Sequence, residues 1–150
     1  MKTTADEEAR HTVELGDIDQ NGMPLITVVA DGCWCKRSYR SNYSSLSGVA
    51  AIVGYHTKKV LFMGLKNKYC TTCFRAAGQG VQPTAHTCYK NWGKNQSSSS
   101  MESAIIEEGF ACSEEMYNLK YARLIANGDS SVYSFSYKTI QVHNCRKNGV

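Results

Sequence analysis

The sequence lacks any apolar run long enough to cross a membrane. Its longest apolar runs, residues 48–54 and 60–65, fall far short of the roughly 20 residues that a membrane helix needs. The first ten residues lack the apolar core of a secretory signal peptide and carry three acidic residues. We therefore expect a globular domain without a membrane part, whose seven cysteines are metal ligands or free thiols rather than a disulfide framework.

Acidic residues are missing from nearly half of the chain. There is no Asp or Glu between Gly32 and Met101, a stretch that holds ten Lys and Arg residues, whereas six acids face two bases within residues 1–20. Seventy residues without an acid favour a polyanionic partner such as nucleic acid. A solvated basic face without any ligand is the equally weighted alternative.

Apolar patterning predicts a mixed sheet with helices. Strands are expected at residues 25–31, 47–56, 59–66 and 121–126. The first of these is nearly continuously apolar, as expected of a central strand buried on both faces. Ser99-x-x-Glu102 predicts a capping box that opens a helix, with Met101, Ile105, Cys112, Met116 and Leu119 on its apolar face. The order of elements indicates an α/β fold.

Two further segments differ in character from these elements. Residues 1–22 are a polar lead-in with a helical turn expected at residues 7–15, followed by a domain over residues 23–150. Residues 68–100 contain three cysteines, one histidine, one of the two prolines and a serine run, and are expected to form an irregular insertion in that domain.

Cysteine and histidine recur at metal-ligand spacing within this insertion. Cys70-x2-Cys73 is followed after twelve residues by His86-x-Cys88. Three thiolates and an imidazole supply the four tetrahedral ligands of a closed structural zinc site. The alternative is four unrelated residues in a cysteine-rich chain.

Two aspartates stand at the ends of predicted strands. Asp31 and Asp129 are each next to a glycine. Strand ends in an α/β sheet form the crevice where ligands bind, and paired carboxylates there are tolerated when divalent cations lie between them. Such a pair could support two-metal phosphodiester cleavage. The alternative, which carries more weight from the residues alone, is that each aspartate is a turn residue.

Several of these motifs together resemble one known family. The stretches VVADGCWCKRSY, HTCYKNW and LKYARLIANGDSSVY, in collinear order between Gly16 and Tyr133, are similar to the core of Mutator-like transposases, especially the insect-type domain. The resemblance implies an RNase H-like fold, with Asp31 and Asp129 as the first two acids of a DDE triad. It also implies that Cys70, Cys73, His86 and Cys88 form the family's structural zinc site.

The family's reaction sets the expectations for function. It is nicking of DNA at transposon ends followed by strand transfer into a target, with two Mg²⁺ or Mn²⁺ ions at the acids. The expected partner is DNA, with self-association left open, and the expected location is the nucleus.

The sequence departs from the family pattern near its end. The family's third acid is a glutamate on a helix well downstream of the second aspartate, but no Asp or Glu follows Asp129 before Val150. We therefore expect a domain truncated at its C-terminus and inactive alone. The alternatives are a non-catalytic, zinc-stabilised DNA-binding remnant and a translated fragment without retained function.

Overall fold

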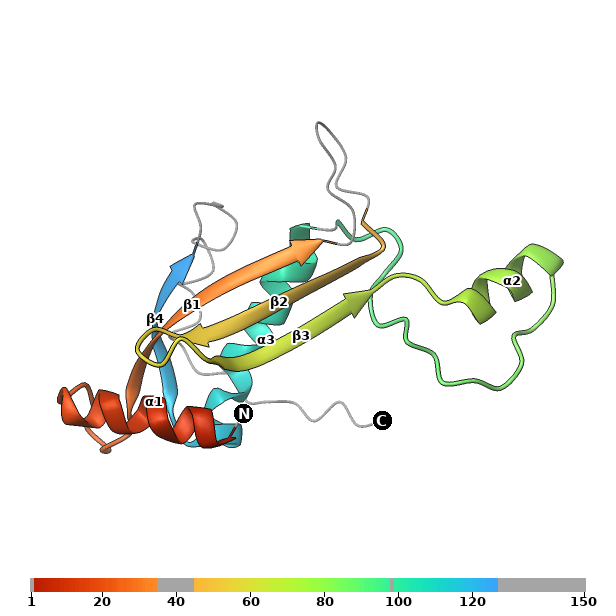
Figure 1. The fold of residues 1–150 in the computed structure, drawn as a ribbon. Helices are drawn as coiled ribbons and strands as arrows, with labels where there is room; N and C mark the ends of the chain where they lie inside the picture. The colour runs from red at the N-terminus through yellow and green to blue at the C-terminus, as the bar shows by residue number, and fades with distance from the viewer. Residues whose placement is uncertain (1, 35–44, 98, 127–150) are drawn as a thin grey trace.

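A computed structural model describes residues 2–34, 45–97 and 99–126 of the chain (Figure 1). The elements are α1 (Lys2–Glu14), β1 (Leu25–Trp34), β2 (Ser47–Gly54), β3 (Val60–Asn67), α2 (Thr71–Gln79), α3 (Ser99–Tyr117) and β4 (Lys120–Ala126). The four expected strands and the long helix are all present. Helix α1 begins five residues earlier than the helical turn expected at residues 7–15. The insertion is not wholly irregular, because it contains α2. No helix in the described ranges is long and apolar enough to span a membrane.

The four strands form one mixed sheet in the order β3-β2-β1-β4. Strands β2 and β3 form an antiparallel hairpin, and β2 also pairs antiparallel with β1. Strand β4 pairs parallel with β1, and their last paired residues are Ala30 and Ala126. The α/β class is therefore confirmed. Because β1 and β4 are parallel, both strands run towards the same end of the sheet.

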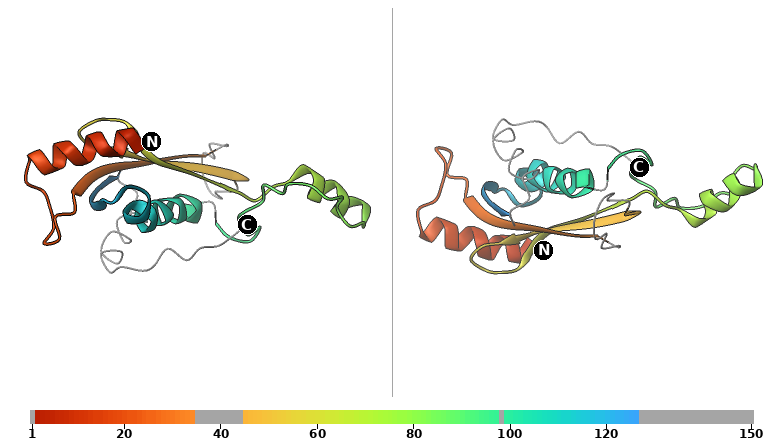
Figure 2. Two further views of the ribbon diagram at one scale, coloured as in Figure 1. Left: turned by 90° about the horizontal axis from the view of Figure 1, so that it is seen from below. Right: turned by 90° about the horizontal axis from the view of Figure 1, so that it is seen from above.

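Strand β1 is internal in the sheet, but the prediction that it is buried on both faces is wrong. Ile26, Val28 and Ala30 are buried, the residues between them are only partly buried, and Asp31 is exposed. The alternation arises because α3 packs along one face of the sheet, while α1 lies by the end of the sheet near the β2–β3 turn (Figure 2). Burial of a β1 side chain therefore depends on whether it faces α3, and not on its place in the apolar run.

The core lies between α3 and the sheet. Ile105 and Ile106 of α3 pack with Ala30 and Ala50, and a second cluster extends the core to Ala5 of α1. The predicted helix face is right for Met101 and Ile105, which are fully buried, and wrong for Met116, which is 47% exposed. Near the start of α3 the hydroxyl oxygen of Ser97 accepts the backbone N–H of Ser100, so this bond adds a cap outside the predicted Ser99–Glu102 box.

Gly109 brings α3 close to the sheet. A Cβ at this position would lie 2.5 Å from Cδ1 of Ile52 and 2.7 Å from Cδ1 of Phe62. Alanine has the higher helix propensity, by about 1 kcal/mol, but overpacking a filled core costs about 1–3 kcal/mol. We expect Gly109→Ala to lower the free energy of unfolding, measured by urea denaturation.

The matched control is Ala111→Gly on an exposed position of the same helix. It should lower stability by about 1 kcal/mol through propensity alone. A Gly109→Ala variant more stable than the parent would show that close packing does not select glycine here.

Candidate metal centre

Residues 68–96, here called the arm, leave the end of β3 and project away from the sheet (Figures 1 and 2). Helix α2 begins after Cys70, whose backbone is extended, and ends at Gly80, whose φ of 67° is left-handed. The N–H of Val81 bonds to the carbonyl of Ala76 at 3.0 Å and closes the last turn. Glycine suits this position because it adopts the left-handed conformation without steric cost. The chain can therefore turn back towards the sheet after only nine helical residues.

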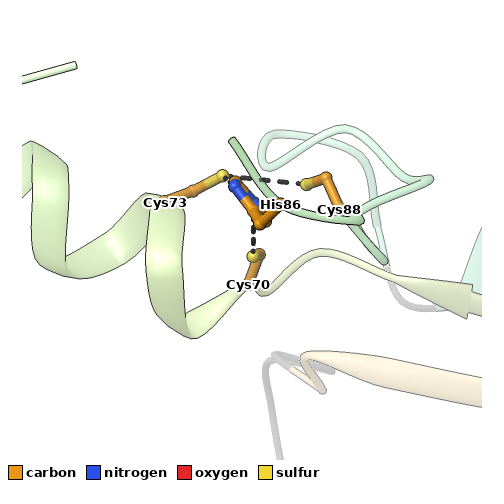
Figure 3. A group of neighbouring side chains, drawn as sticks. All are labelled: Cys70, Cys73, His86 and Cys88. Atoms are coloured by element: carbon orange, nitrogen blue, oxygen red, sulfur yellow. Dashed lines mark hydrogen bonds between the residues drawn. The ribbon is translucent and has the colours of Figure 1, made fainter. Parts of the chain in front are cut away.

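The turn back brings the four predicted ligands together (Figure 3). Cys70 and Cys73 lie at the start of α2, and His86 and Cys88 lie on the returning segment. Nε2 of His86 is 3.3 Å from Sγ of Cys70 and 3.4 Å from Sγ of Cys73. Sγ of Cys73 is 3.7 Å from Sγ of Cys88. All four ligand atoms lie within 4.8 Å of one another.

These separations suit a tetrahedral metal ion. Zinc–sulfur bonds of about 2.3 Å and zinc–nitrogen bonds of about 2.0–2.1 Å place neighbouring ligand atoms about 3.5–3.8 Å apart. The donor set of three sulfurs and one nitrogen is a known structural zinc set. The cluster could therefore hold a metal ion such as zinc. Within the described ranges, no other group of three or more His, Cys, Asp or Glu side chains converges in this way.

A backbone carbonyl orients the histidine ligand. Nδ1 of His86 is 2.8 Å from the carbonyl oxygen of Thr84, so Nδ1 carries the hydrogen and donates it. This leaves Nε2, which faces the two sulfurs, as the metal-binding nitrogen. The same contact is the first cause that raises the pKa of His86 to about 9, followed by Cys88. The sequence carries no sign of this carbonyl, because any residue at position 84 would supply one.

The thiols differ in acidity. The backbone N–H of Cys73 is the main cause that lowers the pKa of Cys70 to about 6, and the backbone N–H of Lys90 is the main cause that lowers the pKa of Cys88. The pKa of Cys73 is raised to about 11, first by its contact with Cys88. Cys70 and Cys88 are thus more acidic than an ordinary thiol, and ionisation of Cys73 beside them is disfavoured. A bound cation would remove this opposition.

Asn91 holds the base of the arm to β3. Its side-chain N–H donates to the carbonyl of Leu65 at 2.8 Å, and its side-chain oxygen accepts the N–H of Asn67 at 2.6 Å. The backbone N–H groups of Asn91 and Trp92 both donate to the carbonyl of Asn67. The two ends of the arm are therefore joined where it leaves the sheet. The sequence analysis missed this role of Asn91, because a lone asparagine in a loop has no distinctive pattern.

Asp31 lies in a different place from the Cys₃His cluster. It is exposed on β1, paired with Ala51 of β2, and stands three residues before the end of the strand rather than at its end. Ala30 packs against α3, so the Asp31 carboxylate points to the other face of the sheet. Asp129 lies outside the described residues, and the pairing of the two aspartates stays a prediction.

Two acids of α3, Glu102 and Glu108, lie apart from Asp31. The side chain of Glu102 lies against Gly32, on the face of the sheet opposite Asp31. Glu108 pairs with Lys66 at 2.7 Å. Neither carboxylate therefore shares a site with Asp31, which agrees with their position before β4 in the chain.

The fold and the cluster define a mixed α/β domain that carries a Cys₃His cluster able to hold a metal ion. The family model for Mutator-like transposases matches residues 1–146, and the chain belongs to this family. Comparisons with curated proteins and with solved structures found no match.

Proposed function

We propose that this chain is part of a transposase that cleaves DNA at transposon ends and transfers the strand into a target. The observation that carries the proposal is the family match over residues 1–146. The strand order β3-β2-β1-β4, with β4 parallel to β1, supports the RNase H-like fold implied by the resemblance. A role in DNA transposition also favours the nucleus as its location, which a fluorescent fusion of the chain would test.

The proposed catalytic residues are Asp31 and Asp129. The described part of β4 ends at Ala126, next to Ala30 on β1, and Asp129 follows three residues later in the sequence. Two Mg²⁺ or Mn²⁺ ions at these carboxylates would supply an activated water and stabilise the leaving oxygen. The role of the two aspartates is to hold these ions on the face of the sheet where Asp31 is exposed, so that a DNA backbone can approach them.

These 150 residues contain two of the family's three acids. No Asp or Glu occurs among residues 130–150. We expect the 150-residue chain alone to leave supercoiled plasmid intact in Mn²⁺, because two carboxylates hold two ions weakly. The measurement is agarose-gel nicking, with Asp31→Asn as the comparison; since Asp31 is exposed, that variant should fold normally. Robust nicking that disappears in Asp31→Asn would contradict the expected inactivity and would identify Asp31 as catalytic.

The second candidate function is DNA binding without catalysis, by a domain that bound zinc would stabilise. The observation in its favour is the acid-free basic stretch between residues 33 and 100. Binding through phosphates should show little sequence preference and weaken steeply with salt. Fluorescence anisotropy with duplex DNA tests it, and no binding at low salt would exclude it.

A further inference from the structure

The arm exposes aromatic side chains to solvent. Phe74 is 65% exposed and Tyr89 is 72% exposed, and Ala76 is the one buried residue among residues 68–96. Tyr69 lies beside Phe74, with ring centroids 5.5 Å apart. These large rings lie mostly in solvent and contribute little to packing within the domain, so their exposure indicates a surface that binds a partner.

The two most exposed aromatics occur in the same short pattern. Cys73-Phe74-Arg75 and Cys88-Tyr89-Lys90 each place an aromatic residue between a ligand cysteine and a cation. The two cysteine sulfurs are 3.7 Å apart, so the cluster holds these segments side by side although they are fifteen positions apart in the chain. The fold thus brings two aromatic–cation pairs to one place on the arm.

The charge of the arm selects the class of partner. Arg75, Lys90 and Lys94 are exposed, and residues 68–96 contain no acid. Exposed cations without acids among them suit a polyanion such as nucleic acid. Exposed aromatic rings beside them suit the faces of nucleic-acid bases, which are accessible only where the strand is unpaired.

We propose that the arm is a single-stranded DNA contact in which bases stack on Phe74 and Tyr89 while Arg75 and Lys90 bind phosphates. This inference rests on the proposed function for its DNA partner and assigns part of that binding to the arm. The metal centre keeps the two segments together, and Asn91 fixes where they stand relative to β3.

The test measures binding of a fluorescent single-stranded oligonucleotide, and of the matching duplex, to the zinc-loaded 150-residue chain. The double variant Phe74→Ala with Tyr89→Ala should weaken single-strand binding at least tenfold, and duplex binding less, because stacking needs free base faces. The double variant Arg75→Gln with Lys90→Gln should lower the slope of log K against log salt by about 1.4 for single strands.

The β2–β3 turn offers a matched control. Nζ of Lys58 lies 4.1 Å from the ring centroid of Tyr55, so this exposed pair has the same two residue types as Tyr89 and Lys90 of the arm. This turn lies at the other end of β3 from the arm (Figure 1). The eight residues of the strand span about 25 Å. The variant Tyr55→Ala with Lys58→Gln should bind both DNAs like the parent.

Each other outcome overturns a specific claim. Bound zinc is measured for every variant, so loss of the arm fold is separated from loss of the contact. If the parent binds neither DNA, the DNA partner of the proposed function fails. If the parent binds and the arm variants match the Tyr55–Lys58 control, only the inference fails. If the aromatic variant retains DNA binding but loses self-association in sedimentation, the surface is a protein interface.

Discussion

Cys70→Ser is expected to abolish stoichiometric zinc binding and to unfold the arm while the sheet stays folded. The physical reason is that the arm has almost no core of its own, with Ala76 its one buried residue. A nine-residue helix such as α2 is not stable in water by itself. Zinc binding to small structural sites contributes about 10–16 kcal/mol in peptides, and this binding free energy is also folding free energy.

Two measurements test this expectation together. Metal analysis should find one zinc per chain in the parent and far less in Cys70→Ser. Hydrogen exchange should show lost protection over residues 71–79 and retained protection over β1 and β2. Cys112→Ser on α3 is the control, because Cys112 lies outside the cluster and should leave zinc content unchanged. Equal zinc content and equal thermal stability of Cys70→Ser and the parent would contradict the zinc assignment.

The second large effect is expected at Glu8 on α1. Its side chain is fully buried, and its two carboxylate oxygens accept the backbone N–H groups of His56 at 2.9 Å and Thr57 at 2.8 Å. The neighbouring Gly54 leaves room for it, since a Cβ there would lie 2.6 Å from the carboxyl carbon. Hydrogen bonds to a charged group contribute about 1.5–3 kcal/mol each, so Glu8→Ala should lower the free energy of unfolding by about 3 kcal/mol or more.

Glu7 is the natural control for Glu8. It is the next residue, and its carboxylate pairs with Lys59 at 2.6 Å on the surface. Exposed pairs of this kind contribute about 0–1 kcal/mol, so Glu7→Ala should remain within that range of the parent in urea denaturation. Similar losses for both variants would mean that the buried carboxylate does not fasten α1 to the β2–β3 turn.

The secondary structure and the four residues that could bind a metal ion were within reach of the sequence. Residues 25–31, 47–56 and 59–66 predict strands because β-branched and apolar residues follow one another between turn residues, which is a local property. The cysteine and histidine ligands were predictable because few other chemistries need that residue set at that spacing. The orientation of the His86 ring was not predictable, because its hydrogen-bond partner is the backbone carbonyl of Thr84.

Long-range polar contacts were decided by the tertiary structure. Glu8 and Thr57 are 49 positions apart, and Asn91 and Leu65 are 26 apart. No local pattern marks these partners, because a hydrogen bond between distant segments depends on how the chain folds back on itself. Glu8 in the sequence is indistinguishable from its surface neighbour Glu7.

The sequence by itself determined which residues form strands and which four side chains have the chemistry to bind one metal ion. The tertiary structure decided which face of each strand is buried, because α3 packs on one face of the sheet and leaves Asp31 exposed on the other. It also placed Ala126 beside Ala30, although 96 positions separate them in the chain. Such pairings depend on the free energy of packing the whole domain, so they cannot be predicted from any short segment of the sequence.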